Sequence, residues 1–152
     1  IYGKLVFYFN TKIMKKLILG AFMFFAIHGS FAQTQDAKTF ITNMGIKAQM
    51  DQAKEEILPN IETGKEADFI KEFDALVSDF TDSFSKLVDE NYDMALIQEA
   101  NKKFAETKEL TQVLPKDAVT FQEKITSLQN EIGVSLQGVL MKYAKPEVLE
   151  SM

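Results

Sequence analysis

The chain has 152 residues, a formal net charge of −5 and neither cysteine nor tryptophan. This length favours one domain, and the lack of cysteine excludes disulfide bonds, thiol nucleophiles and metal sites built on cysteine. All 17 basic side chains are lysines. Because the chain is acidic and lacks the arginines that read phosphates and base edges, we expect no nucleic-acid partner.

The N-terminal part of the chain has the pattern of a secretory signal peptide. Lys15 and Lys16 give the positive start, residues 17–27 form an uncharged apolar run, and Ser30 and Ala32 place small residues where a signal peptidase requires them. The run is shorter than the about 20 residues that a membrane-spanning helix needs. An uncleaved N-terminal anchor is the alternative.

The leader divides the chain into three parts. We expect residues 14–32 to be the cleaved leader and residues 1–13 to be upstream sequence or a mis-set start. We expect residues 33–152 to be a single domain that is exported, to the periplasm or the exterior of a bacterium, without a stable membrane span.

Cleavage would remove His28, the only histidine, and four of the lysines. The remainder has 13 lysines against 22 acidic residues, which gives a formal charge of −9. Nucleophile systems that need histidine or cysteine are then impossible, as are imidazole metal sites. Any enzyme would have to use carboxylates, lysine, hydroxyls or the two tyrosines Tyr92 and Tyr143. We therefore expect neither enzymatic activity nor a cofactor.

The first helical stretch is expected over residues 36–58. Asp36 is a candidate N-cap, and apolar residues follow at helical spacing. Gly45 weakens the middle of this helix, and Pro59 ends it.

The second stretch, residues 66–91, has the strongest pattern in the chain. Apolar residues recur every three or four positions over seven turns, at Phe69, Phe73, Leu76, Val77, Phe80, Phe84, Leu87 and Val88. We interpret the four phenylalanines as core packing; an aromatic ligand site is the alternative.

The third stretch begins near Asn91 or Asp93, with Asp93 as the candidate cap. It continues through Phe104, its end is open between Thr107 and Leu114, and Pro115 closes it.

The fourth stretch runs from Asp117 to about residue 145. Its C-terminal half carries a second apolar line, formed by Val134 and Met141 with Gly138 between them. A helix that is apolar on most sides is buried on most sides. This half therefore either lies at the centre of the bundle or offers a surface to something else, and Gly138 would permit close approach of a neighbouring backbone.

Acidic clusters are the remaining candidates for chemistry. Asp51 with Glu55, and Asp68 with Glu72, lie four residues apart on helices, and a buried acid pair can divide into a proton donor and a base. Polar residues surround both pairs, which favours a solvated helix face. Residues 89–93 gather oxygen ligands at a helix junction; calcium is one interpretation and helix capping the other.

Two segments carry a resemblance to a known family. The chain has Phe-Ile-Lys-Glu-Phe-Asp at residues 69–74 and Leu-Gln-Gly-Val-Leu-Met-Lys-Tyr at residues 136–143, after a lysine-started leader that ends in Ala-Gln. In these features it resembles bacterial exported proteins of the domain of unknown function 2059 family. At residues 104–108 the family's aromatic run followed by Ser-Pro and Gly is replaced by Phe-Ala-Glu-Thr-Lys, so the chain resembles a divergent member. The resemblance implies a helical, envelope-located fold and no particular activity.

Together these patterns predict an all-α protein, a compact bundle of about four helices after the signal peptide. We expect a non-enzymatic protein that binds through its last helix, with Val134, Gly138 and Met141 as the candidate interaction surface. The partner would be another protein, a second copy, or an apolar or lipid-like ligand. The alternative is an envelope stress or chaperone-like holdase.

Overall fold

The computed structural model describes residues 34–150, so the predicted leader and residues 1–13 lie outside the described residues. These residues form an all-α structure, as the sequence predicts. The elements are α2 (Thr34–Asn43), α3 (Ile46–Ile57), the 3-10 helix η1 (Leu58–Asn60), α4 (Glu66–Asn91), α5 (Met94–Thr107), α6 (Ala118–Tyr143) and α7 (Pro146–Glu150). None of these helices is long and apolar enough to span a bilayer.

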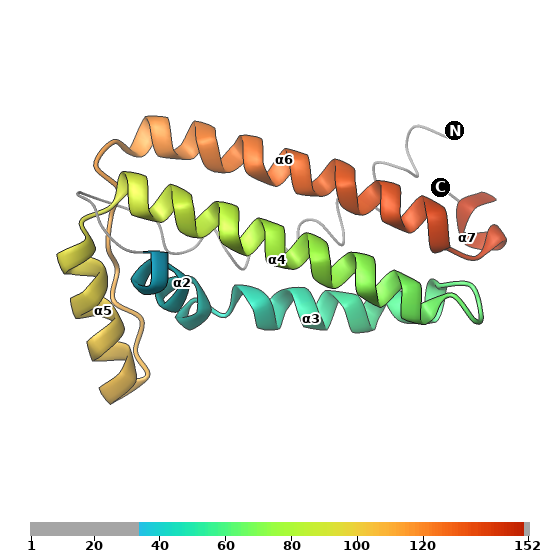
Figure 1. Ribbon diagram of the computed structural model, residues 1–152, viewed down its shortest axis with the longest axis horizontal. Helices are drawn as coiled ribbons and strands as arrows, with labels where there is room; N and C mark the ends of the chain where they lie inside the picture. The colour runs from blue at the N-terminus through green and yellow to red at the C-terminus, as the bar shows by residue number, and fades with distance from the viewer. Residues whose placement is uncertain (1–33, 151–152) are drawn as a thin grey trace.

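The long helix α4 lies at the centre of the arrangement. Figure 1 shows α6 along one side of α4 and the shorter helices α2 and α3 along the other, with α5 leaving at the end where α4 finishes. α6 runs antiparallel to α4. Because α4 contacts both neighbouring layers, most of its apolar side chains are buried.

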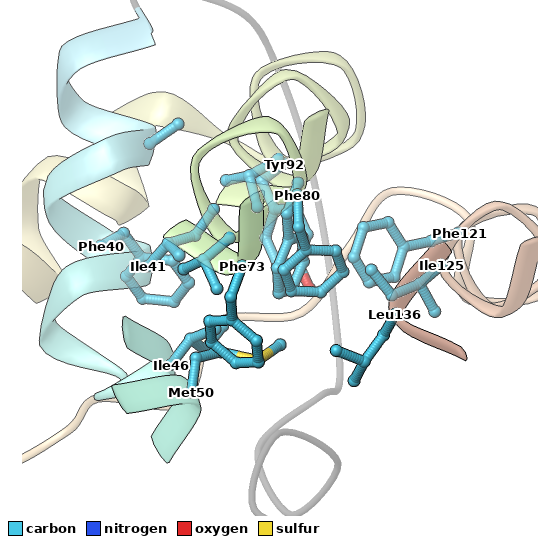
Figure 2. Close-up of a cluster of buried hydrophobic side chains, with 14 of the residues drawn as sticks. Phe40, Ile41, Ile46, Met50, Phe73, Phe80, Tyr92, Phe121, Ile125 and Leu136 are labelled. Atoms are coloured by element: carbon cyan, nitrogen blue, oxygen red, sulfur yellow. The ribbon is translucent and has the colours of Figure 1, made fainter. Parts of the chain in front are cut away.

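The core lies between these layers. Figure 2 shows Phe73 and Phe80 of α4 between Ile46 and Met50 of α3 on one side and α6 on the other. Phe69 packs on Phe73 with ring centroids 5.6 Å apart. The phenylalanines of α4 are therefore core residues, as predicted, and their burial contributes to the hydrophobic stabilisation of the fold.

The first predicted helix is two helices, so its continuity was a wrong prediction. Gly45 adopts a φ of 72°, a left-handed conformation that glycine reaches without steric cost, and its N–H donates to the carbonyl of Thr42 at 2.9 Å. The predicted capping role of Asp36 is wrong as well. Asp36 lies inside α2, where its carboxylate accepts a hydrogen bond from Gln98 of α5 at 2.8 Å.

The structure also defines both ends of α5. Asp93 is its N-cap, as predicted, and the carboxylate accepts hydrogen bonds from the N–H groups of Ala95 and Leu96 at 2.8 and 3.3 Å. The helix ends at Thr107, followed by Lys108 with a φ of 61°. Irregular chain then leads to α6.

Candidate functional site

The last long helix, α6, begins at the predicted residue. The carboxylate of Asp117 accepts hydrogen bonds from the N–H groups of Val119 and Thr120, each at 3.0 Å, and from the Thr120 hydroxyl at 2.7 Å. These bonds hold the pKa of Asp117 below its ordinary value because they favour the ionised form. The hydrogen bond from the Thr120 hydroxyl has the largest effect. The cap therefore defines where the helix starts.

One face of α6 packs against α4. Its buried residues are Phe121, Ile125, Leu136, Leu140 and Tyr143. Leu128, Ile132 and Val139 are partly buried beside them. The three-and-four spacing of this set places it on one side of the helix, so the opposite side is free of the core.

The second apolar line lies on that opposite side. Val134 is 71 % exposed and Met141 is 58 % exposed. Gly138 lies between them, is itself exposed, and a Cβ added there would meet no atom within 4 Å. We call these three residues the outer face. Of the two alternatives left open by the sequence, the structure thus places this line on the surface, while α4 occupies the centre.

A polar cluster holds the C-terminal end of α6 against α4. The Tyr143 hydroxyl donates a hydrogen bond to Glu72 at 2.6 Å, and the Lys142 ammonium group pairs with the same carboxylate. Both contacts lower the pKa of Glu72, and the contact with Lys142 has the larger effect. The Glu72 carboxylate in turn raises the pKa of Lys142. The cluster lies at the surface, so we interpret it as a structural clamp.

The chain just beyond α6 is fixed by backbone hydrogen bonds. Ile61 and Ala144 form an antiparallel bridge, in which the N–H of Glu62 donates to Tyr143 and the N–H of Lys145 donates to Asn60, each at 2.9 Å. Both ends of α6 are therefore tied down, and the outer face lies on a rigid element.

A shallow groove of about 410 Å³ runs between α4 and α6, and none of the three outer-face residues lines it. Its lining includes Leu87 and Leu128, with Lys86, Glu90, Lys124 and Glu131 around them. Lys124 and Glu90 are 3.8 Å apart. The volume of the groove is at the small end of the range for ligand sites. The lining side chains carry charges of both signs, so the groove favours no particular ligand.

The acid pairs considered from the sequence do not form catalytic dyads. Asp51 pairs with Lys47 and Lys54. Both contacts lower the pKa of Asp51, and the contact with Lys47 has the larger effect. Lys54 also reaches Asp74 at 2.6 Å, and these acids raise the pKa of Lys54. In the other candidate pair, Glu72 is paired with Lys142. One acid of each pair thus has a basic partner, while Glu55 and Asp68 are exposed, which favours the solvated helix face.

The oxygen-rich junction at residues 89–93 serves to join helices. Asp93 caps α5, and the Asn91 carbonyl accepts a hydrogen bond from the N–H of Lys116 at 2.7 Å. Among residues 34–150 there is no group of three or more histidine, cysteine or acidic side chains that could hold a metal ion. The junction therefore supports the capping interpretation.

Tyr92 is the residue whose role the sequence did not indicate. It is fully buried, and the centroid of its ring lies 5.1 Å from that of Phe121 and 6.3 Å from that of Phe40. Burial raises the pKa of its hydroxyl above the ordinary value, so the group stays neutral. The one signal in the sequence for this burial is that Tyr92 directly follows the long amphipathic helix α4.

Comparison with known protein families, characterised proteins and solved structures gives no match to this chain. The resemblance to the family of exported bacterial proteins stays a prediction from the two sequence segments that carry it.

Proposed function

We propose that this chain is an exported, non-enzymatic helical protein of the bacterial envelope, and that it binds a partner through the outer face of α6. The observation that carries the proposal is the exposure of Val134 and Met141 on one side of a helix whose other side packs against the core. Single exposed apolar residues are normal on protein surfaces. Val134 and Met141, however, share one stripe of α6 with Gly138 between them, and we infer that this stripe is a contact surface.

The residue types support a binding role over catalysis. After removal of the leader, the chain has no histidine, cysteine or arginine, and one acid of each candidate pair, Asp51 and Glu72, is held in an ion pair with a lysine. Binding through an apolar face needs none of these chemical groups.

The first experiment tests export. The complete chain is expressed in a bacterium, and the intact mass of the product is measured in the exported fraction. We expect a chain that starts at Gln33, because Ser30 and Ala32 define the cleavage position. An uncut chain retained in the cytoplasm would contradict the exported part of the proposal.

The second experiment tests the outer face. Val134→Glu combined with Met141→Glu places two charges on it, and Leu96→Glu combined with Val119→Glu places two charges on exposed apolar positions elsewhere. We expect native mass spectrometry of the exported protein to show an associated mass, either a second copy or a small molecule. The outer-face variant should lose it, and the control variant should keep it.

Circular dichroism of the same samples separates binding from folding. Both variants should keep the helical signal of the unmodified protein, because all four positions are exposed. If the outer-face variant unfolds, its residues are part of the core and the proposal fails. The proposal fails equally if the unmodified protein carries no associated mass.

A further inference from the structure

We propose that Met141 is a site of reversible oxidation by peroxides, and that its conversion to the sulfoxide stops binding at the outer face. This inference rests on the proposed binding role of the outer face. The thioether sulfur attacks one oxygen of hydrogen peroxide and loses two electrons. The O–O bond breaks, a sulfur–oxygen bond forms, and the other peroxide oxygen leaves as water. Methionine sulfoxide reductases reverse the step with electrons from two thiols, which become a disulfide while the sulfoxide oxygen leaves as water.

The composition of the chain leaves methionine as the target of such oxidants. The chain has no cysteine, whose thiolate reacts with peroxides, and no tryptophan. It has seven methionines, which supply all of its sulfur. A peroxide that reacts with this protein by transfer of an oxygen atom is therefore directed to a methionine.

Burial distinguishes Met141 from the other methionines of residues 34–150. Met50 and Met94 belong to the core, and Met44 is partly buried against it. Met141 is exposed, on the outer face. A peroxide in solution therefore reaches the Met141 sulfur in the native fold, whereas Met50 and Met94 react only when the structure around them opens.

Gly138 leaves the Met141 side chain uncovered on the helix surface. In a helix, a long side chain extends towards the preceding turn, and for Met141 this turn contains Gly138. A Cβ added at Gly138 would meet no atom within 4 Å. The surface beside the methionine is thus open, and the lack of a side chain at Gly138 exposes the thioether.

The two lysines that follow Met141 are held by other partners. Lys142 pairs with Glu72 of α4, and the Lys145 ammonium group donates a hydrogen bond to the Pro59 carbonyl at 2.7 Å. These contacts direct both long side chains away from the outer face. Neither lysine therefore shields Met141 from solvent.

Oxidation of Met141 should change the outer face and leave the fold intact. The sulfoxide is polar, whereas the thioether is apolar. Burial of a polar group without a hydrogen-bond partner is unfavourable, so a partner that covers Val134 and Met141 should bind the oxidised chain more weakly. The buried residues of α6 lie on its opposite side, so the helices should stay packed.

Peptide mapping tests the site. The exported protein is treated with hydrogen peroxide and digested after lysine, which places the methionines in four different peptides, those of Met44, Met50, Met94 and Met141. We expect Met141 to gain oxygen about tenfold or more faster than Met50 and Met94, because burial protects these two. In urea the three should react at similar rates, since unfolding removes the protection.

Native mass spectrometry tests the effect on binding. Peroxide should remove the associated mass from the unmodified protein, and treatment with the two methionine sulfoxide reductases, one for each sulfoxide epimer, should restore it. Met141→Leu is the matched control, because leucine is apolar, has a similar volume and forms no sulfoxide. This variant should keep its associated mass in peroxide. Circular dichroism should show the same helical signal before and after oxidation.

Four outcomes would overturn the inference. Met141 could react no faster than Met50 and Met94 in the folded protein, or the oxidised protein could keep its associated mass. Peroxide could also remove the associated mass from Met141→Leu, which would show that oxidation acts elsewhere. In these three cases the proposed function stands if the double-glutamate variant loses the associated mass. The fourth outcome, no associated mass before oxidation, would overturn both proposals.

Discussion

Tyr92 carries a hydroxyl group into the hydrophobic core. The side chain is fully buried, and among the described residues the hydroxyl oxygen has no hydrogen-bond partner. The ring stabilises the fold, because it packs edge-on against Phe121. The two parts of this side chain therefore act in opposite directions on stability.

Tyr92→Phe should leave the free energy of unfolding unchanged or raise it by about 1 kcal/mol, because a buried unpaired hydroxyl is destabilising by about 1–3 kcal/mol. Urea denaturation measures the change. Tyr143→Phe is the matched comparison; it removes the hydrogen bond to Glu72 and should lower stability. A loss of stability in Tyr92→Phe as large as that in Tyr143→Phe would show that the Tyr92 hydroxyl is hydrogen-bonded.

Glu72 gives the clamp at the end of α6 a pH dependence. Lys142 and Tyr143 lower its pKa in the folded chain from the ordinary value of 4.5. A lowered folded pKa contributes stability above the unfolded pKa, and this contribution is lost as the pH falls through the folded value. We expect Glu72→Gln to be less stable than the unmodified protein at pH 7, with the difference shrinking below about pH 4. A difference that does not change between pH 7 and pH 3 would contradict this role of the carboxylate.

At the scale of helices, two glycines have opposite roles. Gly45 adopts a left-handed conformation and separates α2 from α3, whereas Gly138 lies within α6. A Cβ would meet no atom within 4 Å at either position. The difference between them therefore comes from the backbone alone.

Gly45→Ala should lower the free energy of unfolding by about 1–2 kcal/mol, because the left-handed conformation is strained for residues with a side chain. Gly138→Ala should raise it by about 1 kcal/mol in dilute protein, where helix propensity alone acts. Thermal unfolding of both variants at low concentration checks this pair. Equal effects of the two substitutions would show that the break at Gly45 does not depend on its conformation.

At the scale of the molecule, stability should be distributed unevenly around α4. α4 packs against α2 and α3 on one side and α6 on the other, whereas α5 packs mainly on α2. Asn101 links those two helices by hydrogen bonds to Asn43 at 3.0 Å and to the Asp36 carbonyl at 2.9 Å. Residues 105–109 at the end of α5 are exposed.

Native-state hydrogen exchange should therefore show the slowest amides in the middle of α4 and faster exchange in the last turn of α5. Regions with few buried contacts open without global unfolding. Mass spectrometry of peptides from 73–84 and 102–112 measures the difference. Equal protection of the two peptides would indicate that α5 opens only with the whole molecule.

The sequence predicted those features of this fold that depend on local residues. Asp93 was identified as a cap because a carboxylate caps a helix through N–H groups two and three residues later, and the start of the last long helix at Asp117 was predicted as well. The break at Gly45 was missed because propensity gives a cost for glycine but no backbone angle. The exposure of Val134 and Met141 could not be decided from periodicity, because it depends on which helix occupies the centre, and that is a property of the tertiary packing around α4.

The bridge between Ile61 and Ala144 has a consequence for how the chain folds. Its partners lie 83 positions apart, so α4, α5 and α6 form one large closed loop. Closing such a loop lowers the conformational entropy of the chain, and this free-energy cost arises before the hydrogen bonds of the bridge can offset it. Helical proteins fold fast when their contacts are local. This bridge should therefore form late, after α4 and α6 have paired, and substitutions at Ile61 should accelerate unfolding more than they slow folding.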